Sequence, residues 1–215
     1  MKEDILYTLM SMLDGITIFM FAFGCFKISF KDYWKEILVT NLVISVGTFL
    51  LRDEEFLVNL MPFLCFLLLV ASLTFYFRIR IWGSLKLSLY GFVAQIIAQF
   101  TVVALFMFVS KLTFSGAADQ FGTYVQLIGD GALILLTLVL QKRRVWFTTM
   151  SHDYNFKIKL TKINILSMVI AVVIIAFLYN IKSVDNILLA ITFWAICLIN
   201  LMYVDIRKEK SGSYD

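Results

Sequence analysis

At residues 142–162 the chain reads KRRVWFTTMSHDYNFKIKLTK, a basic stretch that separates two long apolar runs. Its cations are Lys142, Arg143, Arg144, Lys157, Lys159 and Lys162, set against the single acidic residue Asp153. Lysine and arginine beside a membrane span resist translocation and stay on the cytoplasmic side. If the flanking runs span a membrane, this stretch lies inside the cell and sets the orientation of the whole chain.

The composition indicates an integral membrane protein. Of the 215 residues, 61% are hydrophobic and only 16% are charged, and the mean hydropathy is +0.88. A soluble domain typically carries about 45–50% apolar and about 25% charged residues. One proline and ten glycines also leave little material for long structured loops. The excess of apolar residues is typical of several membrane spans joined by short connections, so we expect an all-α, polytopic membrane bundle.

The apolar runs predict seven membrane-spanning helices, at residues 5–26, 37–51, 57–77, 87–110, 123–141, 163–181 and 187–205. The second run would be only about 22 Å long at about 1.5 Å per residue, so its helix must include flanking residues. The turn-forming residues of KLTFSGAADQFG, at 111–122, predict a loop. Residues 1–205 would then form the membrane domain, and 206–215, IRKEKSGSYD, a short, polar and disordered cytoplasmic tail.

The distribution of basic residues supports this count of spans. Fifteen of the 19 lysines and arginines fall in residues 27–36, 78–86, 142–162 and 206–215, and the N-terminus and the other connections hold one each. A chain with its N-terminus outside and its C-terminus inside separates the two groups as the positive-inside rule requires. Removing any one span destroys the separation. We therefore expect a multi-pass protein of a bacterial plasma membrane.

Other classes of function have little support in the sequence. The basic residues are divided among short loops, which argues against a nucleic-acid-binding face. The three cysteines, Cys25, Cys65 and Cys197, form no CxxC pair, and His152 is the single histidine, so we expect no metal site and no disulfide. No nucleophile elbow or phosphate-binding loop is present. We accordingly expect a non-enzymatic protein without a cofactor.

Four polar residues in the predicted spans are candidates for a ligand site, because charged groups inside a membrane are costly. The four residues are Asp14, Gln99, Gln126 and Asp130. All four are predicted to lie at similar depths below the outer membrane surface. Gln95 shares a helical face with Gln99, and Gln126 shares one with Asp130. One interpretation is a polar pocket open to the outside. The other is that these groups form hydrogen bonds between helices and hold the bundle together.

Asp130 is the strongest of these candidates. It lies between Gly129 and Gly131, which leave room for a neighbouring helix or for a ligand. In a wet pocket its carboxylate would attract a cationic group, whereas in a dry interface it would be protonated or paired. The variant Asp130→Asn separates the two interpretations, because it keeps the shape of the side chain and removes its charge.

Three segments carry a resemblance to a known family. They are FKDYWKEILVTNLVISVGTFLL at 30–51, FYFRIRIWGSLKLSLY at 75–90 and the basic stretch at 142–162. Together with the span lengths over about 1–205, they resemble the membrane sensor half of peptide-pheromone receptor kinases of the accessory-gene-regulator type. The resemblance implies a sensor that binds a peptide outside the cell. In that family a histidine-bearing helix and an ATP-binding domain follow the last span, so we expect no autokinase activity from this chain.

The expected function is that of a receptor-like or accessory membrane subunit that senses a ligand and acts through a partner. A substrate-binding or permease subunit of a multi-component transporter is one alternative, and a membrane immunity or defence protein is another. The expected partners are the lipid bilayer, a protein or a second copy of the chain, and a peptide or small-molecule ligand. Lys142, Arg143, Arg144, Lys157, Lys159 and Lys162 are expected to bind anionic lipid or an acidic partner surface.

Overall fold

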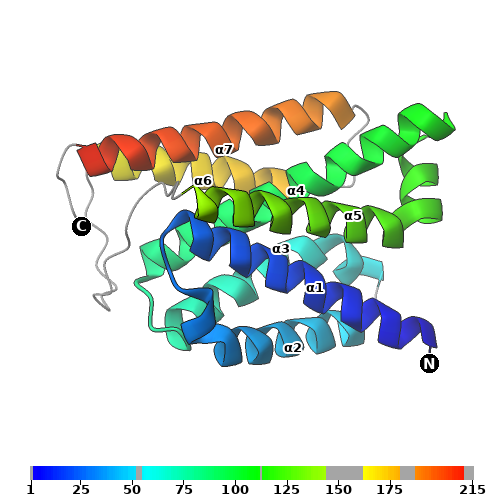
Figure 1. Ribbon diagram of the computed structural model, residues 1–215, viewed down its shortest axis with the longest axis horizontal. Helices are drawn as coiled ribbons and strands as arrows, with labels where there is room; N and C mark the ends of the chain where they lie inside the picture. The colour runs from blue at the N-terminus through cyan, green and yellow to red at the C-terminus, as the bar shows by residue number, and fades with distance from the viewer. Residues whose placement is uncertain (1, 52–54, 112, 144–161, 180–186, 211–215) are drawn as a thin grey trace.

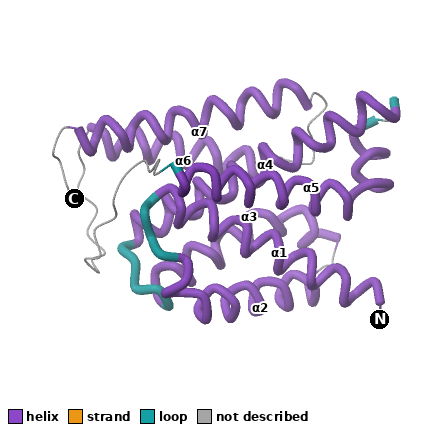
Figure 2. Tube along the Cα trace, in the orientation of Figure 1, coloured by secondary structure: helices purple, strands orange, loops and turns teal. Residues whose placement is uncertain are grey.

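The computed structural model describes residues 2–51, 55–111, 113–143, 162–179 and 187–210. Over these ranges the regular structure is helical throughout, as Figure 2 shows. The helices are α1 (Lys2–Cys25), the 3₁₀ turn η1 (Phe30–Tyr33), α2 (Trp34–Leu51), α3 (Glu55–Phe75), α4 (Ile81–Ser110), α5 (Phe114–Lys142), α6 (Lys162–Tyr179) and α7 (Ile187–Lys210). The predicted all-α class is confirmed, and each of the seven predicted apolar runs corresponds to one α-helix.

Four of these helices contain segments that are long and apolar enough to cross a membrane, judged by length and composition. The segments are Ile5–Cys25, Ile81–Ser110, Gln120–Lys142 and Ile187–Ile206, and the shorter apolar segment Leu60–Phe75 lies in α3. At about 1.5 Å per residue, the 30 residues of α4 extend about 45 Å, more than a hydrocarbon core of about 30 Å needs.

Three predicted boundaries are wrong. Helix α5 begins at Phe114, inside the predicted loop 111–122, because the Thr113 side chain caps it by accepting a hydrogen bond of 3.4 Å from the Gly116 N–H. Helix α7 continues to Lys210, so residues 206–210 of the predicted disordered tail are helical, as their content of good helix formers permits. Helix α4 begins at Ile81, six residues before the predicted start of its span.

The early start of α4 changes the role of Lys86, which was expected in the basic connection at 78–86. Lys86 lies inside α4 and is buried, and its ammonium group forms an ion pair with the Asp205 carboxylate of α7. The hydroxyl of Tyr90, one turn further along α4, donates a 2.9 Å hydrogen bond to the second oxygen of Asp205. This polar contact joins α4 to α7 inside the bundle, and its cation is not a loop charge.

Helix α4 is the centre of the bundle. It packs against α1, α3, α5 and α7, and 15 of its 30 residues are buried. The helices run roughly alongside one another in Figure 1, with the start of α1 at one end of the bundle and the end of α7 at the other. A Cβ at Gly91 of α4 would lie 2.5 Å from Ile18 Cγ2 and 2.9 Å from the Ile18 carbonyl oxygen of α1. The absence of a side chain at Gly91 therefore permits the close approach of α1 and α4.

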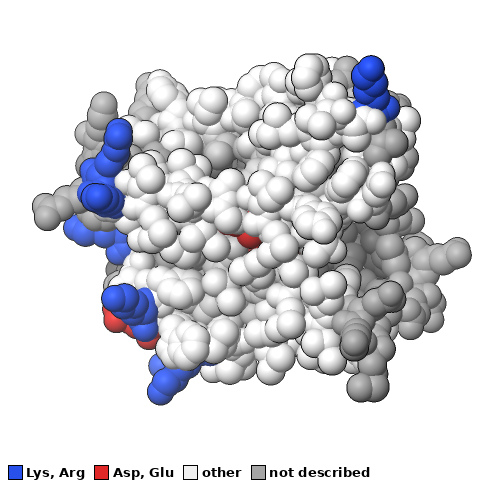
Figure 3. Space-filling model, turned by 45° about the vertical axis from the view of Figure 1, so that its right-hand side comes forward, with Lys and Arg blue, Asp and Glu red and all other residues white. Residues whose placement is uncertain are grey.

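The outward faces of the helices are apolar. Large exposed hydrophobic side chains occur on all seven α-helices, and Phe108 and Val109 near the end of α4 are 87% and 80% exposed. Figure 3 shows lysine and arginine side chains gathered mainly along one edge of the molecule, beside a broad uncharged surface with one acidic side chain near its centre. An apolar surface of this extent is unusual for a soluble monomer and is compatible with lipid contact.

Candidate functional site

Five polar side chains from three helices meet in the interior. Asp14 comes from α1, Gln95 and Gln99 from α4, and Gln126 and Asp130 from α5. One oxygen of the Asp14 carboxylate accepts 2.9 Å hydrogen bonds from the amides of both Gln95 and Gln99. Its other oxygen accepts a 3.2 Å bond from the Gln126 amide. The Gln95 amide also donates to Asp130, so this residue links the two carboxyl groups. These five residues are called the polar cluster below.

Helix periodicity and close packing explain why the cluster forms. Gln95 and Gln99 lie four residues apart and present their amides on one face of α4, as Gln126 and Asp130 do on α5. A Cβ on Gly129 would lie only 3.2 Å from Gln99 Cγ, so the glycine lets α5 approach α4 closely. A Cβ on Gly131 would meet nothing within 4 Å. Of the two glycines beside Asp130, only Gly129 is required by a close contact.

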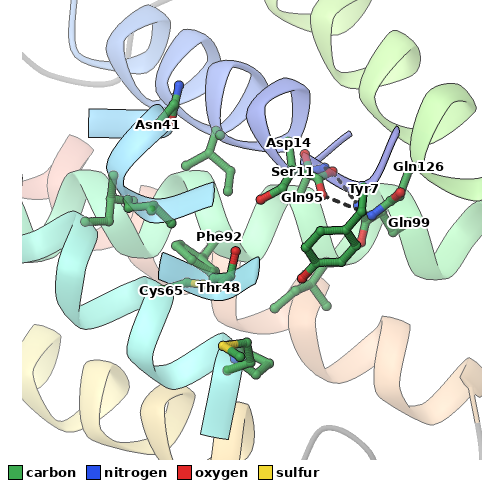
Figure 4. Close-up of a pocket in the computed structure, with 17 residues that line it drawn as sticks. Tyr7, Ser11, Asp14, Asn41, Thr48, Cys65, Phe92, Gln95, Gln99 and Gln126 are labelled. Atoms are coloured by element: carbon green, nitrogen blue, oxygen red, sulfur yellow. Dashed lines mark hydrogen bonds between the residues drawn. The ribbon is translucent and has the colours of Figure 1, made fainter. Parts of the chain in front are cut away.

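A cavity of about 440 Å³ lies beside the cluster, between α1, α2, α3, α4 and α5. Its polar wall includes Asp14, Gln95, Gln99 and Gln126, and Figure 4 shows these four side chains gathered around the dashed hydrogen bonds. The rest of the lining is largely apolar and includes Ile44, Leu69, Phe92 and Ile96. A volume of this size falls within the range of about 300–1,000 Å³ that small-molecule sites occupy.

The cavity lies near the middle of the bundle and reaches toward the end at which α1 begins. Tyr7 and Ser11 reach it from the first half of α1, and Met61 reaches it from the first half of α3. Thr48 comes from the last turns of α2, which runs in the opposite direction to α1. The first halves of α1 and α3 and the end of α2 meet at one cavity because α2 runs antiparallel to both.

Three buried polar atoms at the site have no hydrogen-bond partner among the described residues. They are Gln95 Oε1, Asp130 Oδ2 and Asn41 Nδ2. Gln95 and Asn41 both line the cavity although they are only 5% and 2% exposed, and Asp130 is fully buried. Leaving a buried donor or acceptor unpaired costs about 1–3 kcal/mol. The site therefore retains unused hydrogen-bonding capacity next to an open volume.

A second cavity, of about 420 Å³, lies between α4 and α5. Gln99 and Gln126 line both cavities, and the second is otherwise lined by residues that include Phe100, Phe114 and Val125. The two glutamines therefore form a polar partition between two open volumes.

The structure brings all four predicted ligand-site residues into one network. Gln99 and Gln126 both donate to Asp14, and Asp130 joins them through Gln95. Gln95 was not among the predicted site residues, although its four-residue spacing from Gln99 was a signal for it. Asn41 was also missed, although Ser45 and Thr48 follow it at successive spacings of four and three residues and mark the same face of α2.

The predicted basic site is described only in part. Lys142 ends α5, Arg143 follows it, and both side chains are exposed. Lys162 is the first residue of α6. Arg144, Lys157 and Lys159 lie outside the described residues. The binding of anionic lipid or an acidic partner by this stretch therefore stays a prediction.

Within the described ranges, no group of three or more histidine, cysteine, aspartate or glutamate side chains is placed to hold a metal ion. No family model, curated protein or solved structure matches the chain. The case for a function consequently depends on the chemistry of the polar cluster and its cavity.

Proposed function

We propose that the chain is a multi-pass protein of a bacterial plasma membrane, with seven spans, its N-terminus outside and its C-terminus in the cytoplasm. Apolar side chains on the outward faces of all seven α-helices support this arrangement. With Lys86 reassigned to the interior, 14 of the other 18 lysines and arginines lie in the predicted inner segments. The exposed Lys142 and Arg143, and the basic stretch that follows them, would then face the anionic inner leaflet.

In this membrane the protein acts as a receptor-like or accessory subunit that binds a small ligand from outside. The observation that carries the proposal is the cavity of about 440 Å³, with the polar cluster on its wall, which reaches from the middle of the bundle toward its outer end. Polar groups at this depth are costly, and unpaired ones beside a cavity favour ligand binding over a purely structural role. The resemblance to membrane sensor domains agrees with a binding role.

Helix α4 offers a route from the ligand to a partner. It carries Gln95 and Gln99 at the cavity, and about one to four turns away it carries Tyr90 and Lys86, which contact Asp205 of α7. A ligand that shifts α4 would therefore displace Lys86 and Tyr90 relative to Asp205 of α7, near the cytoplasmic end of the bundle. The signal would reach a partner through the helix surfaces and inner loops.

Transport is the second candidate, and one observation favours it. The cavity between α4 and α5 lies behind Gln99 and Gln126, so rotation of these amides could join two volumes along the bundle. A transporter subunit would move its substrate across proteoliposomes together with an energising partner. A receptor would bind its ligand without net movement across the membrane.

A native cysteine provides the test of outward access. Cys65 is half-buried and lines the cavity, whereas Cys25 and Cys197 are buried elsewhere. A membrane-impermeant thiol reagent added to intact cells should label the protein, and the Cys65→Ser variant should lose the label. Labelling of wild-type protein only in inverted vesicles would contradict a cavity that opens outward.

A further inference from the structure

We propose that the ligand of the cavity is an amphipathic organic monocation, whose ammonium group binds at the Asp14 carboxylate and Gln95 Oε1 while its apolar body lies against the Phe92 side of the cavity. This inference rests on the proposed ligand-binding function and narrows it to one chemical class. Charge, unpaired acceptors and cavity shape each support it.

The charge of the site selects a cation. Of the residues that the structure describes around the cavity, Asp14 alone carries a carboxylate, and Asp130 lies behind it, linked through the Gln95 amide. The side chains that bond the two carboxyl groups are the neutral amides of Gln95, Gln99 and Gln126. Among the described residues that line the cavity there is no lysine, arginine or histidine. A negative charge in apolar surroundings is stabilised by a positive group at short range.

The unpaired atoms match an ammonium group. Gln95 lines the cavity and donates through its amide nitrogen to both carboxyl groups, while its buried oxygen has no donor among the described residues. An ammonium carries three donors and no acceptor, so it can bond to Asp14 and Gln95 Oε1 together. A carboxylate ligand would instead meet two acidic residues. The unpaired Asn41 Nδ2 on α2 is available to an acceptor elsewhere on the ligand.

The size and lining of the cavity call for more than an inorganic ion. One water takes about 30 Å³ of liquid volume, so a bare cation and its shell would leave most of the 440 Å³ unfilled. Figure 4 shows Phe92 and Cys65 away from the hydrogen-bonded group of Asp14 and the glutamines. Leu69, Phe92 and Ile96 supply an apolar wall on which an aliphatic or aromatic body gains free energy by leaving water.

The test compares two probes that differ in charge but hardly in shape, phenethylamine and 2-phenylethanol. The full chain, in detergent at fixed ionic strength, is titrated with each while its thermal unfolding is followed. Phenethylamine should raise the melting temperature and 2-phenylethanol should not. Losing a charge-assisted hydrogen bond should weaken phenethylamine binding by about ten- to a hundredfold in Asp14→Asn. Asp130→Asn, which removes the charge behind Gln95, should weaken it less.

The control variant is Asp32→Asn, which makes the same change at an exposed position in η1 and should keep the full response. An equal response to 2-phenylethanol, or an Asp14→Asn response equal to wild type, would overturn the cationic ligand while leaving a ligand-binding cavity in place. An equal rise in melting temperature with sodium chloride alone would contradict the claim that the ligand carries an organic body. Absence of any shift, with Cys65 still labelled from outside, would overturn the inference but not the outward cavity.

Discussion

Replacing Lys86 with methionine is expected to lower the free energy of unfolding by about 3–5 kcal/mol, because it leaves the buried Asp205 carboxylate without its cation. Methionine has a similar length and keeps the packing of the side-chain stem, so most of the effect should come from the lost charge. Among the described residues, the hydroxyl of Tyr90 would remain as a donor to Asp205, and one neutral hydrogen bond does not replace an ion pair. Unfolding of the purified chain in mixed micelles, followed by helicity, measures the change.

A double-mutant cycle separates the ion pair from packing. Asp205→Asn alone should also destabilise the protein, since it leaves the Lys86 ammonium buried without its anion. The combined Lys86→Met and Asp205→Asn variant has no buried charge at this position and should recover most of the loss. Strictly additive losses in the double variant would show that the two side chains do not depend on each other, and would contradict the α4–α7 ion pair.

Gly91→Ala should destabilise the protein by about 1–3 kcal/mol, which is the usual cost of overpacking a tight interface. Its new Cβ would lie 2.9 Å from the backbone oxygen of Ile18, and a backbone atom cannot rotate away. Helix α1 would have to shift, and it would carry Asp14, one turn before Ile18, out of register with the glutamines of α4. The melting temperature and the phenethylamine response should therefore fall together.

Gly47→Ala is the matched control for this substitution. Gly47 lies in α2, and a Cβ there would meet nothing within 4 Å. Alanine is a better helix former than glycine by about 1 kcal/mol, so the control should be as stable as wild type or slightly more stable. Equal losses at Gly91 and Gly47 would show that the α1–α4 contact is not tight.

The helices and most of the polar cluster could be predicted from the sequence, because placing an unpaired backbone group or a carboxylate in apolar surroundings costs a large free energy. Unpaired backbone groups are costly in an apolar environment, so long apolar runs form helices. A carboxylate within such a run requires a partner, which singled out Asp14 and Asp130. Depth along a helix could also be counted at about 1.5 Å per residue, and this aligned Gln99 with Asp14.

The errors arose where the answer depends on distant parts of the chain. Lys86 looked like a loop charge because its partner Asp205 lies 119 residues away, and only tertiary packing reveals the pair. The rotation of α4 about its own axis determines that Gln95, and not Gln99, bridges the two aspartates. That rotation depends on contacts such as Gly91 against Ile18, which no local pattern encodes.

The orientation of the bundle is the claim on which the outward-facing cavity depends, and two positions on one helix test it. In a background with Cys25, Cys65 and Cys197 replaced by alanine, single cysteines are introduced as Gln120→Cys and Lys142→Cys, at the two ends of the apolar segment Gln120–Lys142. Both native side chains are exposed. An impermeant thiol reagent should label Gln120→Cys in intact cells and Lys142→Cys only in inverted vesicles. Labelling of both from one side, or the reverse pattern, would contradict the proposed arrangement in the membrane.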